Sequence, residues 1–181
     1  MTRLWLALLL APAASLAEVP GGHFYVGAGA YGMYAHDTRS RGDAQTVQKL
    51  SMAVALEATW EEPRWAVTAD VMVGGLARFT ATRVGVRGAW IPLQGPISPY
   101  VGGGFAYLRQ SLDTDLALSP SFANDGAALV LEAGALFFRD NAHFRLALSL
   151  QYVEPFFKLQ DYDSAEGAKV RLTLFGGRIQ F

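Results

Sequence analysis

The chain has 181 residues, 51% of them hydrophobic, and its 15 basic and 16 acidic side chains give a formal charge of −1. This balance argues against a nucleic-acid partner, which needs a basic surface. Cysteine is absent, which excludes disulfides and thiolate chemistry, and no stretch beyond residue 17 holds the roughly 18 consecutive apolar residues of a helical membrane span.

Residues 1–17 have the pattern of a secretory signal peptide. Arg3 supplies the positive start, residues 4–10 form the apolar run, and Ser15-Leu16-Ala17 forms a small-x-small cleavage site. Cleavage would remove one basic residue and no acidic one, which leaves 14 basic against 16 acidic residues and a charge of −2. We therefore expect an exported protein whose residues 18–181 form one domain.

Apolar residues alternate with polar or small residues in eight later segments. The alternation is clearest in 49–60, where Leu50, Met52 and Val54 lie opposite Ser51 and other polar or small residues. A period of two predicts β-strands that each have one apolar face. The predicted strands are 23–34, 49–60, 65–73, 80–91, 100–110, 127–138, 144–152 and 169–181.

The connections between these strands alternate between compact and long. The compact turns are 61–64, 92–99 and 139–142, and the long polar loops are 35–48, 111–126 and 154–168. The connection at 74–79 is an exception, because it is short although it lies at the end of the barrel that carries the long loops. Because lipid tolerates no unpaired sheet edge, the pattern predicts an all-β fold, an eight-stranded antiparallel up-and-down transmembrane β-barrel with both termini at the end of the compact turns.

Two motifs add a family resemblance to this pattern. The first strand opens with the Gly-rich Phe-Tyr-Val-Gly-Ala-Gly-Ala, and the last strand ends on Phe181. Together with the signal and the eight strands, they resemble the small OmpA/OmpX/OmpW-like outer-membrane β-barrel proteins of Gram-negative bacteria. The resemblance implies an outer-membrane location, with both termini periplasmic, and recognition of Phe181 by the barrel-assembly machinery. We expect a barrel without the peptidoglycan-binding domain of the two-domain members.

Aromatic residues gather at the predicted periplasmic ends of the strands, on their apolar faces. Such a belt is typical of a membrane interface, whereas a soluble sandwich with edge-of-core aromatics is the alternative. The predicted girdle is Phe24, Trp60, Trp65, Trp90, Phe137, Phe144 and Phe181, and the predicted second belt at the outer end is Tyr34, Phe79, Tyr107 and Tyr152, with Phe156 and Phe157 beside it.

Charged residues occupy the polar faces, which in an eight-stranded barrel fill a narrow lumen. The predicted lumen network contains Glu57, Asp70, Arg83, Arg87, Glu132, Arg145 and Arg178. Counting from a pairing of Trp65 with Trp90 places Asp70 level with about Gly85, between Arg83 and Arg87. We expect a structural plug, with a gated or leaky polar pore as the alternative.

Catalytic and metal-binding motifs are weak in this sequence. His36, Asp37, Ser40 and Ser51 form the one local combination that could imitate the Ser and His of lipid A-modifying barrels, and the His-x-Ser-Asn type motif of the deacylase family is missing. The acidic residues of loop 154–168 lack the spacing of a calcium loop. We expect no enzyme activity, no cofactor and no metal.

The expected role is structural or surface-interacting, through the three long loops. A narrow conduit for small solutes is the alternative, and a lipid A-modifying enzyme is a more remote one. The expected partners are outer-membrane lipid, lipopolysaccharide and the assembly machinery, and the expected state is a monomer.

Overall fold

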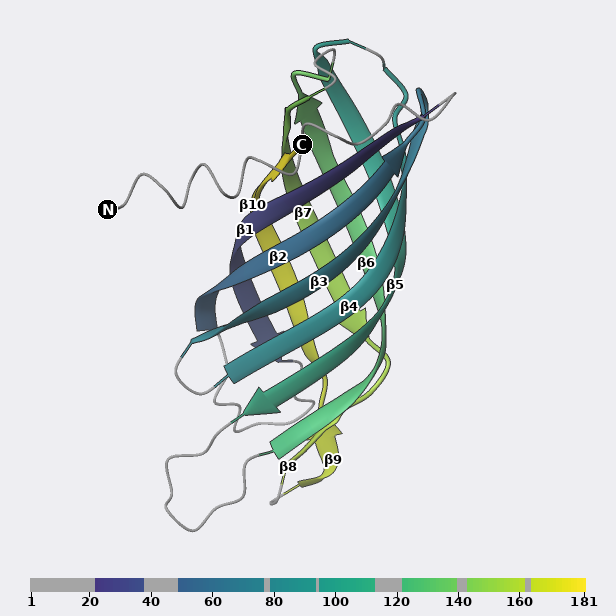
Figure 1. Cartoon of the computed structure of the whole chain (residues 1–181). Coiled ribbons are helices and arrows are strands. Elements are labelled where there is room, and N and C mark those ends of the chain that lie inside the picture. The colour runs from purple at the N-terminus through teal and green to yellow at the C-terminus, as the bar shows by residue number, and fades with distance from the viewer. Residues whose placement is uncertain are drawn as a thin grey trace, which may run out of the picture.

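A computed structural model describes residues 22–37, 49–76, 79–93, 95–112, 122–139, 143–161 and 164–181. Within them, eight antiparallel strands close into a barrel in the order β1-β10-β7-β6-β5-β4-β3-β2 (Figure 1). The barrel strands are β1 (His23–Asp37), β2 (Lys49–Glu61), β3 (Trp65–Leu76), β4 (Phe79–Trp90), β5 (Ile97–Leu112), β6 (Phe122–Phe137), β7 (Arg145–Pro155) and β10 (Val170–Gln180). The predicted barrel is therefore confirmed.

A two-stranded hairpin, β8 (Leu159–Asp161) and β9 (Ser164–Ala168), lies at the loop end of the barrel (Figure 1). In the described part of the chain, no helix is long and apolar enough to cross a membrane.

Alternation of burial separates the two faces of the strands. In β4, for example, the side chains alternate between buried and exposed from Phe79 to Gly88. The exposed faces carry large apolar side chains such as Met52, Phe105 and Phe175, each more than three-fifths exposed. An apolar outer wall around a buried interior is the arrangement that a lipid environment favours.

Several strands extend further than the sequence pattern predicts. The predicted connection at 74–79 lies mostly in strands, because β3 continues to Leu76 and β4 begins at Phe79. β5 and β6 extend into the predicted 92–99 turn and 111–126 loop, and the predicted 154–168 loop contains the β8–β9 hairpin. Backbone pairing with a neighbour continues a strand even where its residues no longer alternate. Residues 38–48 of the first predicted loop lie outside the described residues.

Closure between the first and last strands is regular. Gly27 of β1 is level with Gln180 of β10, and the next step of the ladder is made by the backbone of Phe181, whose N–H donates to the carbonyl of Val26 at 2.9 Å. The return bond from the Val26 N–H to the Phe181 carbonyl is 3.0 Å long. The terminal residue is thus paired in the wall.

Candidate functional site

The middle of the lumen contains a charge network to which every strand of the barrel contributes a side chain. Its members all point inward and are buried. They are Tyr31 (β1), Glu57 (β2), Asp70 (β3), Arg83 and Arg87 (β4), Tyr100 (β5), Glu132 (β6), Gln151 (β7) and Arg178 (β10).

Asp70 and Arg83 form the shortest ion pair of this network. Arg83 donates from Nη2 at 2.5 Å and from Nε at 3.0 Å to the same oxygen, Oδ2 of Asp70. Its other terminal nitrogen donates to Gln151 Oε1 at 2.9 Å, across the barrel. In the register of β3 and β4, Trp65 pairs with Trp90 and Asp70 pairs with Gly85, as predicted from the sequence.

Glu57 and Asp70 lie directly opposite each other on β2 and β3. Like charges in that position destabilise a sheet unless a cation lies between them. Arg87 supplies that cation, since its Nη2 lies 3.2 Å from Glu57 Oε1 and its Nε lies 3.4 Å from Asp70 Oδ1. The third contact of Arg87 is with Glu132 Oε2, at 2.6 Å.

Arg178 closes the network from the opposite wall. It donates to Glu132 Oε1 at 2.8 Å and lies 3.3 Å from Glu57 Oε2. Tyr31 donates to Glu57 at 3.1 Å, and Tyr100 donates to Glu132 at 2.7 Å. The three arginines and three carboxylates balance in charge, so the network meets the condition for burying ions, a partner for each.

Two glycines make room for these tyrosines. A Cβ atom at Gly134 would lie 2.7 Å from the Tyr100 ring, and one at Gly29 would lie 2.8 Å from the Tyr31 ring. Contacts of that length do not occur in folded proteins, so glycine at these inward positions leaves the space that both rings occupy.

Arg145 lies outside this network, contrary to its predicted grouping. It forms an ion pair with Glu61, donates to Gln180 Oε1 at 2.6 Å, and places its guanidinium 3.8 Å from the centre of the Tyr25 ring. Arg139 reaches Glu61 at 2.8 Å from the β6–β7 turn. Glu61 falls in the predicted turn 61–64, yet the alternation of β2 continues through it and points it inward.

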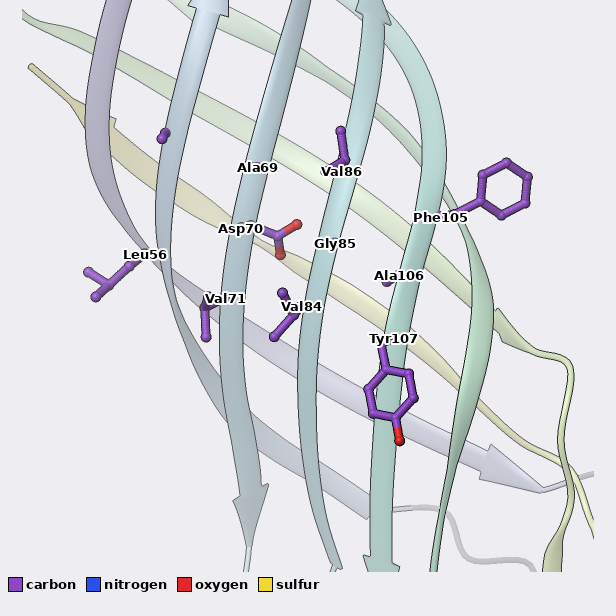
Figure 2. Close-up of a pocket in the computed structure, with 11 residues that line it drawn as sticks. Leu56, Ala69, Asp70, Val71, Val84, Gly85, Val86, Phe105, Ala106 and Tyr107 are labelled. Carbon is purple, nitrogen blue, oxygen red and sulfur yellow. The ribbon is translucent and has the colours of Figure 1, made fainter.

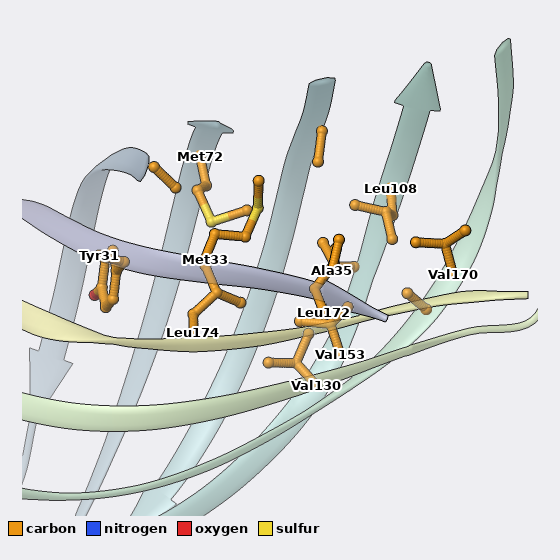
Figure 3. Packing of buried hydrophobic residues seen from close by; sticks show 14 of the residues in the cluster. Tyr31, Met33, Ala35, Met72, Leu108, Val130, Val153, Val170, Leu172 and Leu174 are labelled. Carbon is orange, nitrogen blue, oxygen red and sulfur yellow. The ribbon is translucent and has the colours of Figure 1, made fainter. Parts of the chain in front are cut away.

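The outer half of the lumen is apolar, which the sequence reasoning missed. Figure 3 shows its side chains converging from opposite walls. The buried cluster contains Tyr31, Met33, Ala35, Ala53, Ala55, Met72, Phe79, Ala81, Ala106, Leu108, Ala128, Val130, Val153, Val170, Leu172 and Leu174. Part of the signal was available, because most of these residues take inward positions of the predicted alternation, whereas Ala35, Phe79 and Val153 lie just beyond the predicted strand ends.

A small lumenal cavity, bordered by Glu61, Arg87, Tyr100 and Arg145 among others, has a volume of about 10 Å³, about the space of one water-sized sphere. A larger hollow lies on the outer wall across β2 to β5, where Leu56, Val71, Val84 and Phe105 line it (Figure 2). This lining is suited to hydrocarbon.

The predicted girdle residues are found on the outer wall at the end that carries the compact turns. Phe24 is level with Trp60, and Trp65 is level with Trp90, which is 58% exposed. The Phe144 ring lies 5.7 Å from that of Phe181. Phe137 is the last residue of β6, and its side chain is partly exposed.

Two aromatics of the predicted outer belt lie elsewhere. Phe79 is 2% exposed and packs in the lumenal cluster, because it shares the parity of Ala81 and Arg83 rather than of the outward Thr80. Phe157 packs against the same cluster, whereas Phe156 is exposed. Tyr107 is exposed, and Tyr34 and Tyr152 are partly exposed.

The residues of the catalytic alternative are not brought together. His36 lies on the outer wall and stacks on Tyr34, with ring centres 6.0 Å apart, whereas Ser51 is buried and donates to the Met33 carbonyl. Ser40 lies outside the described residues. Over the described ranges, no cluster of three His, Cys, Asp or Glu side chains could hold a metal ion, and the side chains of Asp161, Asp163 and Glu166 lie outside them.

No protein-family model matches the chain, and no curated protein sequence matches it. Its fold is similar to that of Neisserial surface protein A, with a TM-score of 0.65 and 18% identity over 88% of this chain and 97% of that one. It is also similar to Ail, the attachment invasion locus protein of Yersinia pestis (TM-score 0.56, 15% identity, 89% and 99% covered). A third similar structure is the outer membrane protein OprG of Pseudomonas aeruginosa (TM-score 0.53, 18% identity, 89% and 96% covered). The chain has the fold of small eight-stranded outer-membrane β-barrels.

Proposed function

We propose that this protein is a plugged barrel of the Gram-negative outer membrane, with a structural or surface-interacting role carried by its loops. The observation that supports this proposal most is the network to which all eight strands contribute, beneath an apolar layer in the outer half of the lumen. A substrate or solute would have to displace buried, paired charges to pass.

The loop end offers the surface for interaction. β5 and β6 are the longest strands among the described residues, at 16 residues each, and β8 of the β8–β9 hairpin lies against β6. Loops held by a rigid scaffold are where binding residues concentrate. The similar protein Ail is described as an attachment and invasion protein, and one of its structures contains a heparin analogue.

The remaining parts of the proposal concern the cellular location of the protein and its assembly into the membrane. The signal pattern supports export with cleavage after residue 17. The apolar outer wall supports insertion into the outer membrane with the compact turns in the periplasm. The pairing of the terminal residue with β1 supports recognition of Phe181 by the assembly machinery. The protein would act as a monomer without enzymatic activity, in contact with membrane lipid and lipopolysaccharide.

Surface display of the protein on a non-adherent Gram-negative host tests the proposal. Cells would be allowed to attach to layers of heparin, of a neutral polysaccharide and of serum proteins, with the native chain and with a variant whose residues 113–121 are replaced by a short Gly-Ser turn. The proposal is supported if cells with the native chain stay attached to at least one layer and fewer cells stay attached when the loop is shortened. Heat-modifiable migration of both proteins shows that both barrels are folded, and equal attachment by both and by empty cells would contradict it.

A further inference from the structure

The three compact turns are joined into a ring at the end of the barrel away from the β8–β9 hairpin (Figure 1). The β4–β5 turn is linked to the β2–β3 turn, because the Ile91 N–H donates to the Arg64 carbonyl at 2.9 Å. It is also linked to the β6–β7 turn, because the Phe138 N–H donates to the Pro96 carbonyl at 2.8 Å. A third link, made by Arg139, closes the ring.

Arg139 makes this third link across the mouth of the barrel. Its Nε donates to Glu61 Oε1 at 2.8 Å, and its Nη2 donates to the carbonyl oxygens of Glu62 and Pro63 at 3.2 and 2.6 Å. In the closed sheet, two strands separate the β6–β7 turn from the β2–β3 turn on either side, so these turns lie on opposite walls. The side chains of Arg139 and Glu61 are 8% and 5% exposed, which makes the contact a buried bridge over the mouth.

The backbone of Phe138 is held in an unfavourable conformation directly before this bridge. Its φ of 59° lies in the left-handed region, which bulky residues rarely adopt because Cβ then crowds the following carbonyl oxygen. The bond to Pro96 fixes the residue on one side, and the contacts of Arg139 fix it on the other. Such strain persists only where the surrounding contacts determine the backbone, and here those contacts belong to the ring.

A small apolar cluster fills the lumen next to the bridge. Its buried members are Ala66, Ile91, Tyr100, Leu136 and Ala147. Ala66 is level with Glu61, is 7% exposed and borders the lumenal cavity described above. Any path for solvent from this end of the barrel to the cavity therefore begins at the bridge.

We propose that Arg139 is a strap that keeps the compact-turn end of the lumen closed, and that the strained backbone of Phe138 holds the strap in place. This closure is separate from the ionic and apolar layers, because it joins turns on opposite walls. Glu61 also pairs with Arg145, so the strap can open without leaving this buried carboxylate unpaired. Solvent from this end reaches the cavity when Arg139 releases the opposite turn.

The rate of thiol labelling in the lumen tests the strap. The chain contains no cysteine, so Ala66→Cys introduces a single thiol beside the cavity. The variant would be folded in detergent micelles and treated with a small charged methanethiosulfonate, because a charged reagent enters with water and not through the apolar wall. Labelling should be slow. The added change Arg139→Gln should speed it about tenfold, the factor that corresponds to loss of one hydrogen bond with a charged group.

Arg64→Gln is the matched control for the loss of a cation. Arg64 lies in the β2–β3 turn at the same end, its side chain is exposed, and its link to the ring is through the backbone carbonyl, which the substitution keeps. Labelling of Ala66→Cys should therefore remain slow when Arg64→Gln is added.

Two changes at Phe138 test the role of the strained backbone. Phe138→Val should speed the labelling of Ala66→Cys as Arg139→Gln does, because a β-branched residue strongly disfavours the left-handed conformation. Phe138→Gly should leave labelling slow, because glycine adopts this conformation freely. Equal rates for these two variants would overturn the part assigned to Phe138.

Three outcomes would overturn the strap itself. They are labelling of Ala66→Cys alone as fast as in the urea-unfolded chain, equal rates with and without Arg139→Gln, and an equal acceleration by Arg64→Gln. Heat-modifiable migration of each variant before labelling distinguishes an unfolded barrel from an open strap. The measurement is made at the end opposite the long loops, so failure of the strap leaves the proposed loop-dependent attachment to its own test.

Discussion

The lumen is filled in two chemically different ways, by ions in the middle and by hydrocarbon toward the loops. The ionic layer contains three arginines and three carboxylates that are almost fully buried, each partnered across strands. The apolar layer is held together mainly by packing, with Met33, Met72 and Leu174 fully buried. A narrow barrel can therefore be filled by an ionic layer, which requires one arrangement of its side chains, and by an apolar layer, which tolerates several.

Removal of one carboxylate should have the largest effect on stability. Asp70→Ala leaves Arg83 without its anion and Arg87 with one anion fewer, and we expect the free energy of unfolding to fall by about 3–5 kcal/mol. Urea titration in detergent micelles measures this loss. Asp125→Ala, which removes an exposed outward carboxylate from β6, is the control; equal midpoints for Asp70→Ala and the native chain would mean that the ionic layer is hydrated.

Truncation in the apolar layer should cost less and should depend on the face. Leu174→Ala removes inward packing and leaves a cavity, with an expected loss of about 3 kcal/mol. Leu150→Ala removes the same atoms from the lipid-facing wall of β7 and leaves no internal cavity. The expected loss is therefore only the free energy of transferring these atoms from water to an apolar environment, about 2 kcal/mol. The difference between the two urea midpoints measures the cavity term, and a larger loss for Leu150→Ala would contradict the inward packing.

Deletion of one hydroxyl should give the smallest of the three effects. Tyr100→Phe removes the hydrogen bond to Glu132 and the 3.2 Å contact with Arg178 but leaves both ions paired with each other, and we expect a loss of about 1–2 kcal/mol. Tyr107→Phe, on the exposed face of the same strand, should change the midpoint little. If the two variants behave alike, the tyrosine does not stabilise the ionic layer.

The faces of the strands could be predicted from the sequence, whereas contacts across the lumen could not. Period-two alternation places Asp70 between Arg83 and Arg87 once Trp65 is aligned with Trp90, because neighbouring strands have a countable register. The contacts of Arg83 with Gln151 and of Arg178 with Tyr100 join strands that are not neighbours. Such pairs depend on the tilt and shear of the closed barrel, which no single strand encodes.

Element ends were the weaker part of the sequence reasoning. The predicted turn 61–64 contains Glu61 and the predicted outer belt contains Phe79, although the alternation of β2 and β4 points both side chains inward. The apolar outer layer was missed for a related reason, since no single strand shows at what height in the barrel its inward residues lie. Grouping inward positions by distance from the loop end would have separated the two layers.

Single-channel conductance in planar bilayers tests the sealed lumen most directly. The native chain should insert without producing stable openings, and Asp70→Ala should remain silent as well, because the apolar layer closes the outer half of the lumen independently of the ions. Steady openings of the native chain that Arg83→Ala or Arg87→Ala abolishes would contradict the account and would identify the arginines as the selective lining of a conduit.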